Sequence, residues 1–141
     1  MATMSSTYDG HVAGRSIDAD LTTFAHTLPS HSPWLSVQLP TSSSVSYVVI
    51  KNRADCCQGR LNPFQLWVGA AVGDHNSLTS QSCGVDDLNL TVPSAAGDHG
   101  PFSFRCSDAL GNALNGDFIT LVLPGPDRVL HITDIRAYSP F

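Results

Sequence analysis

Apolar residues in this chain alternate with polar residues in short runs that Pro, Gly and Ser separate. A period of two places every second side chain on the same face, so these runs predict half-buried β-strands. The apolar members of the runs are Leu35, Val37 and Leu39; Val45, Tyr47 and Val49; Phe64, Leu66 and Val68; Leu88, Leu90 and Val92; and Phe102, Phe104 and Cys106. A Ser-rich turn at 42–44 is expected between the first two runs. No segment shows the sustained 3.6-residue period of an amphipathic helix.

Two runs near the end of the chain depart from simple alternation. Residues 118–123 are apolar on both faces, as in a strand that is covered on both sides. In the last run the apolar phase slips by one residue at Thr133 and Asp134, which predicts a β-bulge. Many short strands with turns between them indicate an all-β fold, a β-sandwich or jelly roll. We expect one domain over residues 1–141, with Trp34 and Trp67 in its core.

The composition excludes several classes of protein. Charged residues make up only 13% of the chain, about half the usual share. Seven Lys and Arg residues and a net charge of −5 argue against a nucleic-acid partner. No apolar run approaches the length that crosses a bilayer, so no membrane insertion is expected. Residues 1–10 lack the apolar stretch of a secretion signal, so we expect a secreted form to have lost its signal or the domain to have been cut from a longer chain.

Four cysteines, at positions 56, 57, 83 and 106, allow three disulfide pairings. We favour an adjacent Cys56–Cys57 bridge together with Cys83–Cys106. Disulfides of this kind indicate an oxidising compartment and an extracellular, secreted protein. Zinc is the alternative, but no CxxC or HxxxH spacing supports it. The histidines outside the motif described below, among them His11 and His131, are expected at the surface or with hydrogen-bond partners.

The stretch from Lys51 to Arg60 concentrates the candidate chemistry. Adjacent cysteines that bridge have Cα atoms at most about 3.8 Å apart, below the usual 4.4–6.8 Å, so their ring is strained. The ring also offers a flat, uncharged platform for the apolar face of a sugar. Arg53 and Arg60 would donate to hydroxyl oxygens, and Asp55 lies between them to orient an arginine. The alternative is an ordinary surface ion pair beside unrelated cysteines.

His26 precedes Arg53 by 26 residues, and Arg53-x-Asp55 is followed by four residues and Arg60. This arrangement, H-x26-R-x-D-x4-R with the double cysteine inside it, resembles the fucose-binding motif of the F-type lectins, or fucolectins. The likeness runs from about residue 5 to residue 138 and includes Pro33-Trp34 and the strand after it. It implies a jelly roll related in architecture to discoidin domains, and fucosylated glycans, through terminal L-fucose, as partners.

The resemblance also assigns roles to individual residues. The residues that would bind or support fucose are His26, Arg53, Asp55, Cys56, Cys57, Arg60, Tyr8 and Phe24. The histidine and the arginines would hydrogen-bond the ring oxygen and the 3- and 4-hydroxyls, while Asp55 would hold an arginine. The disulfide would stack on the sugar, and the two aromatic residues are candidates for a wall beside the 6-methyl group.

A structural Ca²⁺ is a further implication of the resemblance. Its ligands would be the side chains of Asp18, Thr23 and Asp134 and backbone carbonyls near Arg15, Asp20 and Thr133. Oxygen ligands from a loop and a distant strand suit a hard cation, although an ordinary acidic turn is the alternative. The chain departs from the family at Ala19, where many relatives have Gly. It departs again at Phe24 and Thr133, where relatives often have a bridging cysteine pair.

Other functions fit the sequence less well. A glycosidase needs a carboxylate pair, and Asp55 alone lies near the motif. No G-x-S-x-G signature or thioredoxin-like CxxC is present, so we expect no enzyme. A discoidin-like membrane- or protein-binding module is the alternative. Such a module would need exposed apolar residues on its loops, whereas these loops are rich in Ser, Asp and Gly. A homo-oligomer would raise avidity for multivalent glycans.

Overall fold

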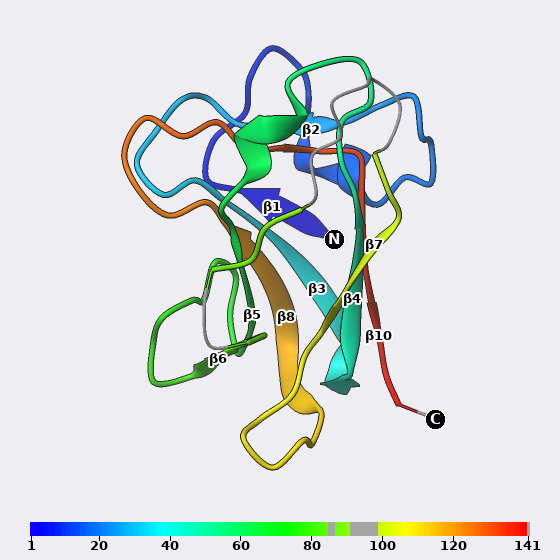
Figure 1. Cartoon of the computed structure of the whole chain (residues 1–141), viewed down its shortest axis with the longest axis vertical. Coiled ribbons are helices and arrows are strands. Elements are labelled where there is room, and N and C mark those ends of the chain that lie inside the picture. The colour runs from blue at the N-terminus through cyan, green and yellow to red at the C-terminus, as the bar shows by residue number, and fades with distance from the viewer. Residues whose placement is uncertain (85–86, 91–98, 141) are drawn as a thin grey trace.

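The computed structural model describes residues 1–84, 87–90 and 99–140, and it confirms an all-β sandwich (Figure 1). One antiparallel sheet has the strand order β1 (Ala2–Met4), β3 (Trp34–Val45), β8 (Leu114–Val122), β5 (Gln65–Gly69) and β6 (Ser80–Ser82). A second has the order β10 (Asp134–Tyr138), β4 (Tyr47–Lys51) and β7 (Phe102–Arg105). The ribbon of β2 (Ala25–His26) and β9 (His131–Ile132) completes the described strands.

The described helices are two short 3-10 segments, η1 (Ala13–Ser16) and η2 (Gln58–Leu61). Neither helix is long and apolar enough to cross a membrane.

The core lies between the two larger sheets and follows the alternation of the strands. Leu35 of β3 and Leu66 of β5 point into it, as do Val48 and Ile50 of β4, and all four are at most 1% exposed. Burying a side chain of this size contributes about 1.5–3 kcal/mol, so the alternating positions make a large favourable contribution to folding. The predicted runs at 64–68 and 118–123 are confirmed, and residues 119–123 are buried on both faces.

The turn between β3 and β4 differs from the prediction. Ser43 and Ser44 are still paired with β8, after a register shift that begins at Gln38, and the chain turns at Ser46. This turn reverses the predicted phase, so Tyr47 lies outside while Val48 and Ile50 are buried. The prediction failed because the turn falls nearer Tyr47 than the serine cluster suggests.

Thr133 marks a change of sheet where a β-bulge was predicted. β9 pairs with β2, whereas β10 pairs with β4, so the two phases belong to different sheets. In the predicted run at 88–92, Leu88 forms a bridge with Phe64 and Val92 lies outside the described residues. Trp34 and Trp67 lie in strands as expected, but both are only half-buried.

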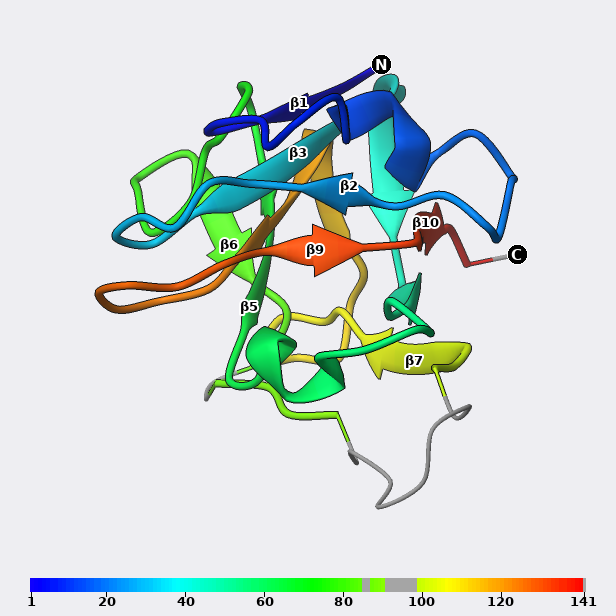
Figure 2. The ribbon, with the colours of Figure 1, turned by 90° about the horizontal axis from the view of Figure 1, so that it is seen from above.

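Both predicted disulfide pairings are confirmed. Cys83 follows β6 and Cys106 follows β7, with 4.2 Å between their Cα atoms, so this bridge joins the two larger sheets. The bridge between Cys56 and Cys57 lies at the opposite end of the sandwich, beside η2. Viewed from above, the β2–β9 ribbon and η2 lie over that end of the sheets (Figure 2). Backbone hydrogen bonds from Tyr8 to His26 and from His26 to His11 bind the N-terminal loop to the ribbon.

Candidate functional site

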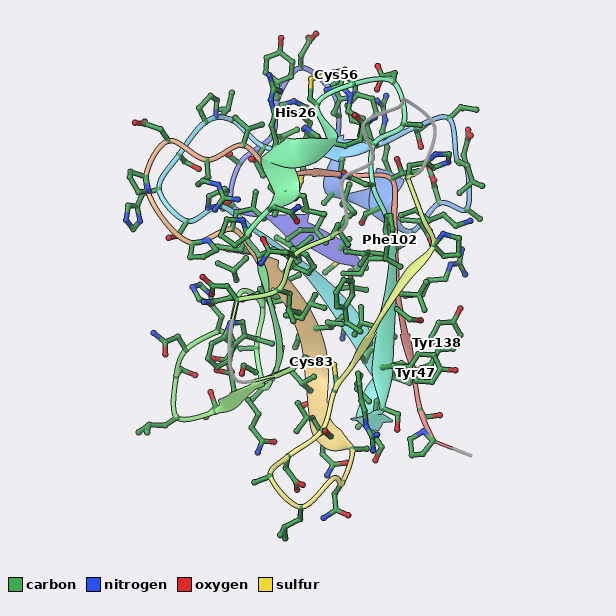
Figure 3. All side chains as sticks on the ribbon, in the orientation of Figure 1. His26, Tyr47, Cys56, Cys83, Phe102 and Tyr138 are labelled. Atoms are coloured by element: carbon green, nitrogen blue, oxygen red, sulfur yellow. A yellow bond between two sulfur atoms is a disulfide. The ribbon has the colours of Figure 1, made fainter. Side chains whose placement is uncertain are left out.

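A hollow of about 390 Å³ opens at the end of the sandwich where the ribbon and η2 meet. Figure 3 shows His26 and Cys56 at this end, away from Tyr47 and Tyr138. The residues that line the hollow are Tyr8, His26, Pro29, Arg53, Cys56, Cys57, Arg60 and Val129. Six of these are among the eight residues assigned to sugar binding from the sequence. Pro29 and Val129 were not predicted, because neither carries a chemical signal of its own.

The bridged cysteines form part of the wall. Their Cα atoms are 3.7 Å apart, and both residues are half-buried. Cys57 has a φ of 66°, a left-handed conformation that few non-glycine residues adopt, and it immediately precedes η2. Such conformations persist where the surrounding structure holds them in place, often at functional sites. At the bridge, two neighbouring side chains supply the contacts that hold the backbone.

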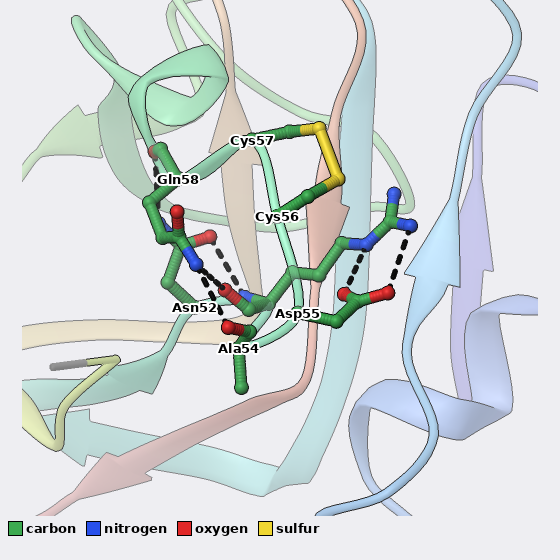
Figure 4. Close-up of a disulfide and its surroundings, with 7 residues drawn as sticks. Asn52, Ala54, Asp55, Cys56, Cys57 and Gln58 are labelled. Atoms are coloured by element: carbon green, nitrogen blue, oxygen red, sulfur yellow. Dashed lines mark hydrogen bonds and ion pairs between the residues drawn. A yellow bond between two sulfur atoms is a disulfide. The ribbon is translucent and has the colours of Figure 1, made fainter. Parts of the chain in front are cut away.

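Two amide side chains brace this loop (Figure 4). Asn52, 1% exposed, donates from Nδ2 to the Gln58 carbonyl at 2.9 Å, and its Oδ1 accepts from the Arg53 amide. Gln58 Nε2 in turn donates to the carbonyls of Arg53 and Ala54, at 3.2 and 2.9 Å. Sequence analysis missed both residues, although an amide on each side of the cysteine pair is the signal that marks them.

Arg53 is fixed by an ion pair and by an aromatic ring. Its Nε and Nη2 donate to the two carboxylate oxygens of Asp55 at 2.6 and 3.2 Å, which is the predicted orienting contact. Its Cζ lies 4.2 Å from the ring centroid of Phe24, a cation–π geometry. The hydrogen bonds from Arg53 also hold the pKa of Asp55 below its usual value. Phe24 was predicted as a wall of the sugar pocket, but it packs against Arg53 and does not line the hollow.

His26 is held as a hydrogen-bond acceptor. Its Nδ1 lies 2.7 Å from the Thr27 carbonyl oxygen, which can only accept, so Nδ1 carries the proton. Burial lowers the pKa of His26, and the charges of Arg53 and Arg60 add to this, while the Thr27 hydrogen bond opposes it. The neutral ring therefore leaves Nε2 as an acceptor at the hollow.

Arg60 completes the polar set. It is exposed, and its guanidinium makes no hydrogen bond or ion pair with any residue that the structure describes. Donors on Arg53 and Arg60 and an acceptor on His26 suit a ligand whose neighbouring hydroxyls both give and take hydrogen bonds.

The ring of His26 packs in a cluster of aromatic rings. The His26 ring centroid lies 4.9 Å from that of Tyr8 and 5.4 Å from that of His131. His131 is 1% exposed, and neither ring nitrogen finds a partner among the described residues. This contradicts the expectation of a surface or hydrogen-bonded residue, because ring packing holds His131 in the core. Burial, followed by the charges of Arg53, His26 and Arg60, lowers the pKa of His131 to about 3. His11, by contrast, accepts from Arg15 through Nδ1.

The predicted acidic loop folds as a tight turn. Asp18 Oδ1 accepts from the Asp20 amide at 2.9 Å, and Asp18 Oδ2 accepts from the Thr23 hydroxyl at 2.8 Å. Ala19 between the two aspartates has a φ of 61°, the left-handed conformation that glycine would adopt more readily. Thr23 and Thr133 line a second hollow of about 250 Å³, so the loop reaches the chain just before β10.

The side chain of Asp134 fits a cation ligand. It is 5% exposed, and its Oδ2 accepts from Arg136 Nε, but its Oδ1 has no partner among the described residues. A buried carboxylate oxygen without a partner is costly, and a cation would remove that cost. η1, which carries Arg15, packs against β10. In the described part of the chain, no three His, Cys, Asp or Glu side chains gather around one point, so hydroxyl and carbonyl oxygens would complete such a site.

The fold and this set of residues define a galactose-binding-domain-like protein. The family described as NedA-like, galactose-binding domain (F5/F8 type C) matches residues 15–98, and the chain belongs to it. Fucolectin-1 of Anguilla japonica is 30% identical over 112 residues, which cover 79% of this chain and 56% of the fucolectin. The pentraxin fusion protein of Xenopus laevis is 27% identical over 132 residues, 93% of this chain and 28% of that protein. The chain thus spans about half or less of these relatives.

Solved structures share the fold. A fucolectin from striped bass (Morone saxatilis) serum superimposes with a TM-score of 0.79 at 24% identity, over 99% of this chain and 46% of that one. The lectin domain of lectinolysin, complexed with Lewis B antigen, gives a TM-score of 0.75 at 17% identity, over 100% of this chain and 93% of that one. Together with the fucolectin relatives, these structures confirm the predicted resemblance to the F-type lectins.

Proposed function

We propose that this domain is a lectin that binds terminal L-fucose on glycans. The observation that carries the proposal is the convergence of Arg53, Arg60 and His26 on one hollow beside the Cys56–Cys57 bridge. Two of the relatives are fucolectins, and a structural neighbour is a lectin domain complexed with Lewis B antigen. These similarities to other proteins support the proposal independently of the geometry of the hollow.

The chemistry of the hollow suits fucose. The guanidinium groups of Arg53 and Arg60 would donate to the ring oxygen and to the 3- and 4-hydroxyls. His26 Nε2 would accept from a hydroxyl, because its proton sits on Nδ1. The disulfide would meet the apolar face of the sugar, and Tyr8 would contact the 6-methyl group.

We infer that the domain is not an enzyme. None of the eight described residues that line the hollow is a carboxylate. Asp55, the nearest acid in the sequence, is ion-paired to Arg53, and its lowered pKa makes it a poor proton donor. A glycosidase would need a protonated acid and a second carboxylate at the sugar. We therefore expect binding without hydrolysis.

We also propose a structural Ca²⁺ between the acidic loop and β10. Asp18, Thr23 and Asp134 would hold it through side-chain oxygens, and Arg15, Asp20 and Thr133 through backbone carbonyls. The unpartnered Oδ1 of Asp134 supports this assignment. The ion would supply the positive charge that the buried carboxylate lacks and would tie the loop to the sheet.

We propose a secreted protein, since disulfides form and persist mainly in oxidising compartments and this domain has two. A homo-oligomer would raise avidity for clustered fucosylated glycans.

A discoidin-like membrane or protein binder is the second candidate, and one observation favours it. Leu78 and Leu110 are fully or largely exposed, at 106% and 87%, so the expectation of loops without exposed apolar residues was wrong. Their loops lie at the end of the sandwich opposite η2 (Figure 1).

Calorimetry with methyl α-L-fucoside tests the lectin proposal. Arg53→Ala and Arg60→Ala should each weaken binding by at least about 2 kcal/mol, or about thirtyfold, because each removes charge-assisted donors. Arg105→Ala, an exposed arginine of β7 outside the hollow, is the matched control and should bind like the parent. Binding within threefold of the parent by either hollow variant contradicts the assignment. Vesicle binding without fucoside binding would favour the second candidate.

A further inference from the structure

Arg128, in the connection between β8 and β9, gathers backbone carbonyls from two loops. Its Nη2 lies 2.9 Å from the carbonyl oxygen of Pro63, 3.0 Å from that of Asn62 and 3.2 Å from that of Arg60. The Leu61 carbonyl follows at 3.4 Å, and Nη1 donates to Pro124 at 2.7 Å. The side chain is half-buried, and this burial lowers the pKa of Arg128. Nη2 carries two hydrogens, which it shares among the four carbonyls of residues 60–63, while Nη1 serves Pro124.

The four carbonyls near Nη2 belong to the end of η2 and the residues that follow, and one is the carbonyl of Arg60 itself. The Arg60 guanidinium has no partner among the described residues, so the backbone position at Arg60 is what limits where its side chain can reach. That backbone is also tied by hydrogen bonds from the Arg60 amide to the Cys57 carbonyl, at 3.1 Å, and from the Asn62 amide to the Gly59 carbonyl, at 3.3 Å, and the Asn62 side chain pairs with the backbone of Leu90. Loss of the Arg128 contacts would leave these bonds and the buried Leu61 in place but would loosen the wall segment that carries Arg60.

Arg128 also reaches two other parts of the same wall. Its backbone pairs with Ser30 in both directions, at 2.9 and 3.0 Å. Pro29, next to Ser30, and Val129, next to Arg128, both line the hollow. One residue therefore connects three wall segments that lie far apart in the sequence. None of its donors points to a carboxylate within hydrogen-bond distance, which distinguishes it from a surface ion pair.

We propose that Arg128 is a positioning residue, which holds the end of η2 so that the Arg60 guanidinium faces the bound sugar. The inference has two halves. The first, that Arg128 holds the end of η2, does not depend on a ligand. The second, that this places the Arg60 guanidinium at the sugar, rests on the proposed fucose site. Arg128 does not line the hollow itself, so it acts through Arg60 and not by contact.

A double-mutant cycle on methyl α-L-fucoside binding tests the second half. Arg128→Met should weaken binding at least tenfold, and Arg128→Lys should fall between Met and the parent. In an Arg60→Ala background, Arg128→Met should add less than a threefold further loss. Arg105→Met makes the same change at an exposed site and should leave binding unchanged. Parent-like binding by Arg128→Met, or losses that multiply in the double variant, would overturn the proposal.

Hydrogen exchange without ligand tests the first half. The amides of Arg60 and Asn62 donate to the carbonyls of Cys57 and Gly59, so their exchange reports on the η2 turn. In Arg128→Met both should exchange faster while the amides of β8 keep their parent rates. If Arg128→Met does not fold, Arg128→Lys carries both measurements. Unchanged exchange at Arg60 and Asn62 overturns the inference. A parent that binds no fucoside overturns the proposed function and leaves the exchange result to decide on Arg128.

Discussion

Burial of His131 should link the stability of this domain to pH. The residue is 1% exposed, its ring nitrogens have no partner among the described residues, and its pKa falls to about 3. In the unfolded chain the same imidazole should titrate near 6.5. At pH values between these two pKa values, the imidazole is protonated in the unfolded state and neutral in the folded state. His131 therefore has little effect on the free energy of unfolding above about pH 6.5. As the pH falls below 6.5, protonation of the unfolded state lowers that free energy.

The size of the effect follows from the two pKa values. Each pH unit below 6.5 costs about 1.4 kcal/mol until the folded pKa is reached. At pH 5 the cost is about 2 kcal/mol, against about 0.2 kcal/mol at pH 7. The pKa of His26 is also lowered, so it acts with the same sign. Carboxylates whose pKa is lowered, such as Asp55, stay ionised in both states over this range and contribute little.

Urea unfolding of the parent and of His131→Leu at pH 7 and pH 5, at fixed calcium concentration, isolates the contribution of His131. The parent should lose about 2 kcal/mol more than the variant between the two pH values, because the His26 effect is common to both. His31→Leu, at an exposed position, should keep the pH dependence of the parent. A difference below about 0.5 kcal/mol, near the scatter of the extrapolation, would show that His131 is hydrated or protonated in the folded protein.

Three further predictions concern the binding site and the proposed ion. Fucoside affinity measured by calorimetry should fall about tenfold per pH unit below the lowered pKa of His26, since protonation removes the Nε2 acceptor; a flat profile into mild acid contradicts this role. A calcium chelator should lower the melting temperature of the parent but not of Asp134→Asn, and identical parent melting curves would show that no ion is bound. A Cys56→Ser, Cys57→Ser double variant should fold, because so short a loop adds little chain entropy, yet bind fucoside at least tenfold more weakly. Parent-like affinity would exclude a role for the platform.

The sequence by itself determined what depends on neighbours along the chain. Alternation gave the strands and hence an all-β sandwich, because a strand repeats its faces every two residues whatever it packs against. The ion pair of Arg53 with Asp55 and the Cys56–Cys57 bridge also join residues at most two positions apart. His26 was assigned to the site from its spacing to Arg53 in a family motif, and no local interaction along the chain indicated it.

Only the tertiary structure decided which distant segments meet. Arg128 lies 66 positions from Asn62, and Val129 lines the same hollow as Arg60 and Tyr8. Sequence periodicity carries no information on such meetings, because they depend on how the two sheets and their loops pack. The same limit explains Phe24, which packs against Arg53, and the apparent bulge at Thr133, where the chain changes sheets. His131 is the clearest case, since a lone histidine in a strand shows its burial and its lowered pKa only when the surrounding rings are in place.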